Sequence, residues 1–258
     1  MPELQIATCG SGPALVMLHG WAMHGGVFAP LVARLQQDFT LHVVDLPGHG
    51  RSADSSIPLE LDACARAIAE RTPRALWLGW SLGGLVALHA AQQLPDSVRG
   101  LAMICASARF VRADDWPQGM DDSVFRGFAD ALARDYRGTI DRFLLLEAQG
   151  SDHVREEIRL LRQQVFAFGE PSQRRLIEGL IVLQDSDLRD GLTTLEMPSL
   201  WLAGRRDRLV SPQAMQACAE SAPHGRYACI QGGGHAPFLT HADEVAAAIR
   251  EFAQALPE

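Results

Sequence analysis

Residues 75–84 read ALWLGWSLGG, and this stretch predicts the fold more directly than any other part of the chain. Its first four residues form a short apolar run of the kind that becomes a buried strand, and residues 85–93 carry the spacing of a helix. Between them, Gly79-Trp80-Ser81-Leu82-Gly83 matches the pattern G-x-S-x-G. Because the pattern lies between a strand and a helix, it predicts a sharp turn that presents Ser81 as a nucleophile.

The glycines of this pattern have a steric purpose. In so tight a turn, side chains two residues before and after the serine would collide, and Gly79 and Gly83 have none. The turn raises the hydroxyl above the edge of the sheet. It also directs the first N–H groups of the following helix toward charge that develops beside the serine.

Outward from this stretch, short apolar runs alternate with helical patterns. The expected strands are 14–18, 40–44, 75–78, 101–105, 199–203 and 226–230, and the expected helices are 27–36, 59–71, 85–93, 212–221 and 242–255. Alternation of this kind predicts an α/β fold, in which a mostly parallel, doubly wound sheet has helices on both faces.

One long segment interrupts the alternation. Between residues 109 and 190 there is no convincing strand, but helical patterns occur near 123–136, 139–148, 152–166 and 172–183. We therefore expect a core formed by 1–108 and 191–258, with 109–190 inserted as a helical lid. The alternative is a structural insertion without a functional role.

A serine nucleophile needs a base, and in this type of fold the chain order is serine, then acid, then histidine. His235 lies in a glycine-rich loop after the last predicted strand, and Asp207 follows the strand before it. Both positions are at the carboxyl ends of strands, where open α/β sheets place their sites. The alternatives are a lone surface histidine and, because three arginines flank Asp207, a salt-bridged surface carboxylate.

The expected reaction also needs two N–H donors to stabilise an oxyanion. The backbone of Leu82, directly after the nucleophile, is one candidate. The loop after the first core strand reads His19-Gly20-Trp21 and offers the backbone N–H of Trp21 as the other. The Trp21 ring would then form a wall of the acyl pocket; the alternative is an ordinary core residue.

Composition excludes several classes of function. The 258 residues carry a net charge of −8, which disfavours nucleic acid as a partner. The chain has no lysine, so Schiff-base chemistry, a P-loop and a Ser–Lys dyad are excluded. Five scattered cysteines indicate neither a disulfide framework nor a metal site. Without a visible signal sequence or a membrane-spanning run, we expect a cytoplasmic protein, monomeric and without membrane association.

Several segments resemble the α/β-hydrolase superfamily along nearly the whole chain: HGW at 19–21, DLPGHGRS at 45–52, GWSLGG at 79–84, GRRD at 204–207 and GGGHAPF at 232–238. The strings LHVVDLPG (41–48), WLGWSLGGL (77–85), DWP (115–117) and DRFLLL (141–146) are most similar to the pimeloyl-carrier-protein methyl ester esterases of biotin synthesis. The resemblance implies hydrolysis of a pimeloyl methyl ester carried on acyl-carrier protein, without a cofactor or metal.

The resemblance also implies residue roles. Ser81, Asp207 and His235 would form the catalytic triad. The substrate site would be lined by Trp21, Ser81, Leu82, Phe143, Leu144, Leu145, Leu146, Glu147 and His235. Small esters would also be hydrolysed in vitro. Glu147 departs from the family, whose members can carry glutamine there, and its charge could alter substrate tolerance.

The same resemblance implies that arginines of the expected lid bind the carrier protein. Arg155, Arg159 and Arg162 share one helical face, and Arg142 lies on the preceding helix. Such a patch would suit an acidic carrier protein and the phosphate of its pantetheine arm. The alternative is a solvated charged face. Where the family has another lid arginine, this chain has Gly138, so that contact would be shifted or missing.

Three other functions remain open from the sequence. The first is a general carboxylesterase for short acyl esters, and the second is a C–C bond hydrolase that uses the same triad. The third is a binding protein that keeps the fold as a ligand pocket without catalysis. A dehalogenase is excluded, because it would need a carboxylate at the position of Ser81.

Overall fold

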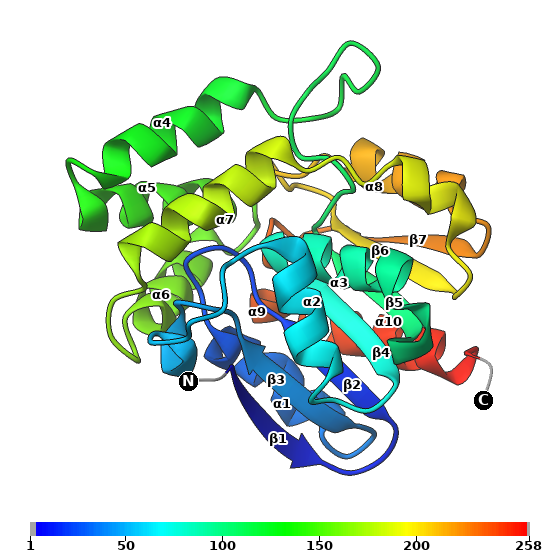
Figure 1. Ribbon diagram of the computed structural model, residues 1–258. Coiled ribbons are helices and arrows are strands. Elements are labelled where there is room, and N and C mark those ends of the chain that lie inside the picture. The colour runs from blue at the N-terminus through cyan, green and yellow to red at the C-terminus, as the bar shows by residue number, and fades with distance from the viewer. Residues whose placement is uncertain (1–3, 257–258) are drawn as a thin grey trace.

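The computed structural model describes residues 4–256 and contains one seven-stranded sheet with helices on both faces (Figure 1). The strands are β1 Gln5–Gly10, β2 Ala14–Leu18, β3 Thr40–Asp45, β4 Ala75–Trp80, β5 Val98–Ile104, β6 Ser199–Gly204 and β7 Gly225–Ile230. Their spatial order is β1-β3-β2-β4-β5-β6-β7, and all neighbours are parallel except β1 and β3. The order reverses at β2, as in a doubly wound sheet.

The centre of the sheet is buried on both faces. Every residue of β4 and β6 is buried, which explains why these strands read as continuous apolar runs rather than as an alternation. Because β2, β4, β6 and β7 run in the same direction, the residues that follow them gather at one edge of the sheet. This edge holds the loop after Leu18, Ser81, Asp207 and His235.

Two layers of helices cover the sheet. One face carries α1 (Ala29–Leu35) and α10 (Ala242–Gln254), and the other carries α2 (Leu61–Ala69), α3 (Leu82–Gln93) and α8 (Pro212–Ser221), as Figure 1 shows. Helix α3 is apolar around most of its circumference, because α2 and the inserted helices cover the sides that do not face the sheet. The nucleophile turn therefore leads into a helix that is packed on nearly all sides.

Four inserted helices lie between β5 and β6, where the sequence predicts only helical patterns. They are α4 Asp122–Leu132, α5 Tyr136–Ala148, α6 Val154–Val165 and α7 Gln173–Asp185. In Figure 1 they form a green-to-yellow group at one side of the molecule, apart from the helices that flank the sheet. Helices α4 and α7 contact each other, as do α5 and α6, and α7 contacts α3 of the core.

The edge strand β1 is the main element that the sequence analysis missed. Its six residues, QIATCG, are exposed or only partly buried, so no apolar run or clean alternation marks it. Backbone pairing with β3, antiparallel from Gln5 opposite Asp45 to Gly10 opposite Thr40, is what makes it a strand. The short helix α9 (Pro237–Thr240) was also not predicted, because four residues carry no helical period.

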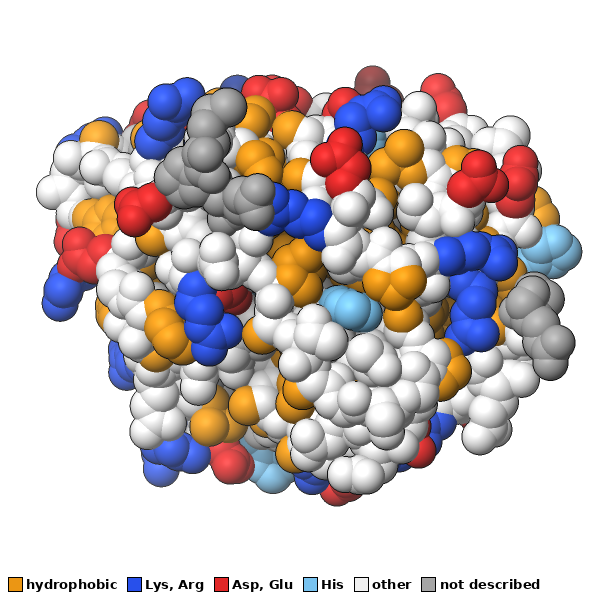
Figure 2. Space-filling view, turned by 60° about the horizontal axis from the view of Figure 1, so that its bottom comes forward, with side chains coloured by type: hydrophobic (Ala, Val, Ile, Leu, Met, Phe, Trp, Pro, Cys, Tyr) orange, Lys and Arg blue, Asp and Glu red, His pale blue; other side chains and the backbone are white. Residues whose placement is uncertain are grey.

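Surface charge agrees with the mixed composition. Figure 2 shows one face of the molecule, on which acidic and basic side chains are interspersed around the edge of the view rather than collected into one basic patch. Among the helices of residues 4–256, none is both long enough and apolar enough to cross a bilayer.

Candidate active site

The backbone at Ser81 is strained in the way a nucleophile turn requires. Its φ is 54° and its ψ is −121°, a conformation that non-glycine residues rarely adopt. A Cβ built on Gly79 would lie 2.4 Å from the carbonyl oxygen of Gly83, and one built on Gly83 would lie 2.3 Å from that of Leu18. Any side chain at either position would therefore force the turn apart.

The side chains of Asp207 and His235 contact each other, as the sequence predicts for the acid and the base of a triad. His235 Nδ1 lies 2.8 Å from Asp207 Oδ2, and both side chains are fully buried. The other carboxylate oxygen, Oδ1, accepts hydrogen bonds from the backbone N–H groups of Leu209 at 2.8 Å and Val210 at 2.9 Å. The loop after β6 thus holds the carboxylate rigidly, and the carboxylate orients the imidazole.

Trp80 connects the histidine to the nucleophile turn. Its indole N–H donates to the carbonyl oxygen of His235 at 2.8 Å, and the two rings lie 5.7 Å apart. Ser81 directly follows Trp80. Within the part of the chain that the structure describes, Ser81 Oγ and His235 Nε2 are both buried without a hydrogen-bond partner. Buried polar groups without a hydrogen-bond partner are rare in folded proteins. In enzymes, the hydrogen bond between nucleophile and base often forms fully only when substrate binds.

The predicted oxyanion loop lies directly against the serine. A Cβ built on Gly20 would come within 3.2 Å of Ser81 Cβ. His19 fixes this loop, since its Nε2 accepts from the backbone N–H of Leu46 at 2.9 Å and its Nδ1 donates to the carbonyl oxygen of Gly20 at 2.8 Å. Burial, together with nearby His49, lowers the pKa of His19 well below its usual value, so the neutral ring serves both bonds.

Aromatic rings from the core and from the inserted helices meet above this loop. The rings of Trp21 and Phe143 lie 4.6 Å apart, and Phe128 of α4 lies 5.4 Å from Phe143. The indole N–H of Trp21 donates to the carbonyl oxygen of Leu176 in α7 at 2.7 Å. A Cβ on Gly179 of α7 would lie 2.9 Å from the Trp21 ring and 3.3 Å from the Leu82 side chain. The insertion therefore packs directly on both predicted oxyanion residues.

The predicted acyl-lining residues of α5 do not all face this cluster. Phe143, Leu144 and Glu147 are buried, and Leu146 is partly buried. Leu145 is 43% exposed. Residues i and i+4 share a helical face, so Phe143 and Glu147 point the same way while Leu145 points nearly opposite. The structure does not bring the Leu145 side chain to the site, because the helical period turns it toward solvent.

Glu147 is a buried acid close to the triad. Its side chain is inaccessible, and neither carboxyl oxygen has a hydrogen-bond partner among the described residues. Burial raises the pKa of Glu147 well above its usual value, and the neighbouring carboxyl groups of Asp207 and Glu157 raise it further. Both effects favour the neutral acid, whose shape and polarity are close to those of glutamine.

We expect Glu147→Gln to stabilise the protein at neutral and alkaline pH. In the parent, the unfolded chain releases this proton above about pH 4.5 while the folded chain keeps it, so stability falls as pH rises toward the folded-state pKa. Glutamine removes that loss. We expect the melting temperature at pH 8 to rise by roughly 2–4 °C, the effect of about 1 kcal/mol in a protein of this size.

The measurement is thermal unfolding of both proteins between pH 4 and pH 9. The gain should shrink toward zero as the pH falls below about 4.5, where both states of the parent hold the proton. Glu156→Gln, at the exposed neighbour of Glu157, is the control and should show no such trend. A gain independent of pH would contradict the neutral-acid assignment.

The four arginines of the predicted docking patch, all on the inserted helices, differ in how their charge is balanced. Arg162 pairs with Asp141 at 2.6 Å, and Arg142 lies 3.2 Å from Asp135. Arg155 and Arg159 are exposed, and neither forms an ion pair within residues 4–256. Arg159 donates a hydrogen bond to Gln163 at 3.1 Å. Two arginines of the predicted docking patch are therefore neutralised locally, and two are free to meet an acidic partner.

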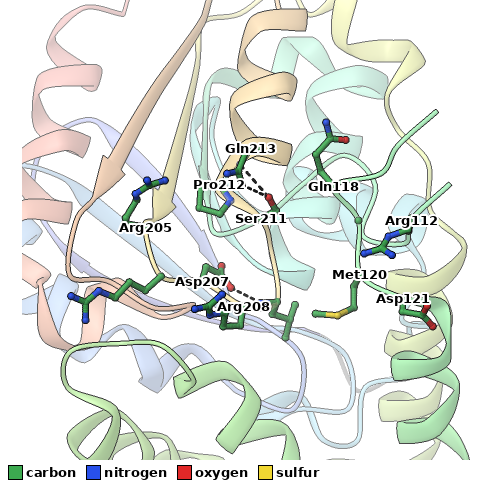
Figure 3. Close-up of a pocket in the computed structure, with 13 residues that line it drawn as sticks. Arg112, Gln118, Met120, Asp121, Arg205, Asp207, Arg208, Ser211, Pro212 and Gln213 are labelled. Atoms are coloured by element: carbon green, nitrogen blue, oxygen red, sulfur yellow. Dashed lines mark hydrogen bonds between the residues drawn. The ribbon is translucent and has the colours of Figure 1, made fainter. Parts of the chain in front are cut away.

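An open cavity of about 480 Å³ borders Asp207 (Figure 3). One wall is the segment from Arg112 to Asp121, and the other is the loop from Arg205 to Gln213. Four of its lining residues are arginines: Arg112, Arg205, Arg206 and Arg208. Its polar and charged wall suits water or an anionic group better than an apolar chain, which fits better among the aromatic rings above Ser81.

Cys105, Asp207 and His235 place potential ligand atoms within 4.8 Å of one another. Burial raises the pKa of the Cys105 thiol well above its usual value, and Asp207 adds to this. A metal would need the thiolate, and it would have to break the bond between His235 and Asp207. The donor set therefore fits a hydrogen-bonded triad better than a metal site.

The family model described as "alpha/beta hydrolase fold" matches residues 13–242. The chain belongs to the α/β-hydrolase family. Among solved structures, this hydrolase resembles an esterase from Exiguobacterium antarcticum with a TM-score of 0.86 at 22% identity, covering 98% of this chain and 96% of that one. A bromoperoxidase from Bacillus anthracis gives 0.89 at 21%, covering 97% and 95%. The predicted fold is confirmed; at these identities nothing follows about the substrate.

Curated relatives are much more similar in sequence to this hydrolase. A pimeloyl-[acyl-carrier protein] methyl ester esterase from Stenotrophomonas maltophilia (strain K279a) is 58% identical over 253 residues, which cover 98% of this chain and 97% of the relative. One of the same name from Xanthomonas campestris pv. campestris (strain B100) is 57% identical over 254 residues, covering 98% and 100%. The predicted resemblance to this esterase family is confirmed.

Two features of the hydrolase's site escaped the sequence analysis. Phe128 of α4 completes the aromatic cluster, and Glu157 of α6 lies behind His235. The apolar spacing of α4 could have indicated that Phe128 is at least partly buried, but not which residues it contacts. A glutamate in a charged helix gives no signal of burial, so Glu157 could be found only in the folded structure.

Proposed function

We propose that this protein is a carboxylic ester hydrolase that removes the methyl group from the pimeloyl methyl ester of an acyl-carrier protein, in biotin synthesis. The observation that carries the proposal is the buried 2.8 Å contact between His235 and Asp207 beside the strained turn at Ser81. Relatives named for this reaction are 57–58% identical over nearly the whole chain, which supports the substrate.

The proposed reaction begins with attack by Ser81 Oγ on the ester carbonyl carbon. His235 Nε2 accepts the serine proton as the C–O bond forms, and Asp207 stabilises the imidazolium. The negative charge on the former carbonyl oxygen is met by the backbone N–H groups of Leu82 and Trp21. Each such donor lowers the barrier by roughly 2.7–4 kcal/mol.

Collapse of the tetrahedral intermediate breaks the bond to the methoxy group, which leaves as methanol with the proton from His235. Water then enters, gives a proton to His235 and attacks the acyl-enzyme carbonyl. In the second collapse, His235 returns its proton to Ser81 Oγ, and the acyl group leaves as the carboxylic acid, which loses its proton to solvent. The aromatic cluster of Trp21, Phe128 and Phe143 would hold the acyl chain and limit the water that reaches the site.

In this proposal, acyl-carrier protein docks on the inserted helices through the exposed arginines of α6. We expect the double charge reversal of Arg155 and Arg159 to glutamate to lower kcat/KM for the carrier-bound ester by roughly 10-fold or more, which is about 1.4 kcal/mol. These two arginines are exposed and lack an ion pair among the described residues, so an acidic carrier can use them. Hydrolysis of p-nitrophenyl butyrate should change little, since neither arginine contacts the triad.

The control is Arg226→Glu, an exposed position on β7 away from the insertion. It should leave both activities unchanged. Equal losses on both substrates in the double variant would contradict carrier docking at this face. Reversal of Arg142 or Arg162 should have a smaller effect, because Asp135 and Asp141 already neutralise them.

The substrate itself is tested by comparing kcat/KM for the pimeloyl methyl ester on acyl-carrier protein with that for the free methyl ester. A strong preference for the carrier-bound form supports the proposal. Equal rates would indicate a general carboxylesterase instead. Growth of a biotin-requiring strain that lacks its own esterase, when it expresses this chain, tests the proposed place in biotin synthesis.

A further inference from the structure

The last turn of α5 and its connection to α6 contact both loops that carry the partners of Ser81. The carbonyl oxygen of Glu147 accepts from the backbone N–H of His235 at 3.4 Å. The backbone N–H of Asp152 donates to the carbonyl oxygen of Gly232 at 3.2 Å, and the Asp152 carboxylate pairs with Arg206, the neighbour of Asp207. This corner of the insertion is therefore bonded to the site rather than lying loosely above it.

Glu157 is the side chain at the centre of this contact. Its Oε1 accepts hydrogen bonds from Ser151 Oγ at 2.6 Å and from Thr240 Oγ1 at 2.9 Å. Its Oε2 lies where a Cβ built on Gly234 would be only 3.4 Å away. Gly234 directly precedes His235, and Thr240 ends the short helix α9 that follows it. The Glu157 carboxyl group thus bonds to the chain after the histidine and lies beside the residue before it.

The burial of Glu157 is unusual for a carboxyl group. The Glu157 side chain is inaccessible to solvent, although the charged residues nearest to it in the helix, Arg155, Glu156 and Arg159, are exposed. Burial raises the pKa of Glu157, while the hydrogen bonds from Ser151 and Thr240 and the neighbouring His153 and His235 oppose that rise. Burying a carboxyl group costs free energy that an apolar side chain would avoid, so its contacts to the histidine loop are the feature that needs explaining.

We propose that Glu157 is a positioning residue, which holds the loop of His235 in the register that lets Nε2 reach Ser81. This inference rests on the proposed function, because it assigns His235 the role of base. Its consequence is that helix α6 of the insertion is part of the support of the triad. Opening of the site to substrate must then come from other parts of the insertion, since displacing α6 would release the base.

The test compares Glu157→Ala, Glu157→Gln and the matched control Glu156→Ala, with p-nitrophenyl butyrate as substrate. We expect the alanine variant to lose roughly 10- to 100-fold in kcat with KM within about 2-fold, because small displacements of a catalytic group have effects of this size. Glutamine keeps an acceptor for Ser151 and Thr240, so it should restore kcat to within about 3-fold of the parent. Glu156 is exposed on the same turn, and its variant should match the parent.

Thermal unfolding of each variant separates positioning from stability. If Glu157→Ala keeps the parental kcat at a temperature where it is folded, or if the glutamine variant is as impaired as the alanine variant, the inference is overturned. Thr240→Val removes one donor without emptying the site and should lower kcat by a few-fold even if Glu157→Ala does not fold. A parental kcat in Thr240→Val would then count against the proposal.

The rate at which a fluorophosphonate labels Ser81 distinguishes this inference from the proposed function. Labelling needs the base but neither a carrier nor a methyl ester. A parent that is labelled, with slower labelling in Glu157→Ala, supports the inference whatever the substrate proves to be. A parent that is not labelled overturns both, whereas equal rates in parent and variant overturn the inference alone.

Discussion

Replacing Ser81 with alanine is expected to lower kcat for p-nitrophenyl butyrate by about 10⁵- to 10⁶-fold, because loss of a triad serine removes the whole acyl-enzyme route. The residual rate would come from binding and from the oxyanion donors, which the substitution leaves in place. Alanine lacks only the hydroxyl, so the strained turn and the packing of Gly79 and Gly83 should survive. The measurement is steady-state hydrolysis with enzyme concentrations high enough to detect the residual rate.

A matched control is Ser221→Ala, at the exposed end of α8. It removes a hydroxyl that donates to the carbonyl oxygen of Ala217 and should leave turnover unchanged. Covalent labelling by a fluorophosphonate should occur in the parent and in the control but not in Ser81→Ala. Turnover like that of the parent in Ser81→Ala would refute the assignment of the nucleophile.

The second large effect is expected for Asp207→Asn, a loss of about 10³- to 10⁴-fold in kcat. Asp207 Oδ1 accepts two backbone N–H groups, from Leu209 and Val210. The asparagine oxygen would keep those bonds, which leaves its NH₂ group facing His235 Nδ1. The histidine must then accept at Nδ1 and carry its proton on Nε2. In that tautomer it cannot take the proton of Ser81.

This argument predicts a specific pattern of results. The variant should fold with nearly the parental melting temperature, since the replaced side chain is isosteric and its backbone bonds remain. Asp62→Asn, an exposed partner of Arg66, is the control and should keep full activity. If Asp207→Asn loses less than about 10-fold, the carboxylate does not act through the tautomer of His235.

Local sequence was sufficient for the nucleophile turn. The glycines that make room for it lie within two residues of Ser81, and their purpose can be read from the pattern alone. The order of Asp207 and His235 along the chain also predicted their meeting, because parallel strands bring their carboxyl ends to one edge. The resemblance then predicted an esterase family that the curated relatives confirm.

Other features depended on neighbours distant in the chain. The edge strand β1 exists through pairing with β3, not through any apolar pattern of its own. Leu145 was predicted to line the substrate site, but the orientation of α5 turns it outward. A sequence shows which residues share a helical face, yet only packing decides which face is covered.

Charge pairing and burial were likewise decided by the tertiary structure. The sequence places Arg142 and Arg162 in one basic patch, but in the structure Asp135 and Asp141 pair with them. The sequence around Glu157 is typical of a surface helix. In the structure Glu157 is buried, and Thr240, 83 positions away in the chain, donates a hydrogen bond to it.

The sequence by itself determined the strand–turn–helix at Ser81, the order of its partners and the class of fold, because steric and periodic rules act over a few residues. The tertiary structure alone decided which side chains surround the triad and which charges stay free. Those properties depend on the burial and distance of groups far apart along the chain, and electrostatic interactions follow distance in space rather than separation in sequence.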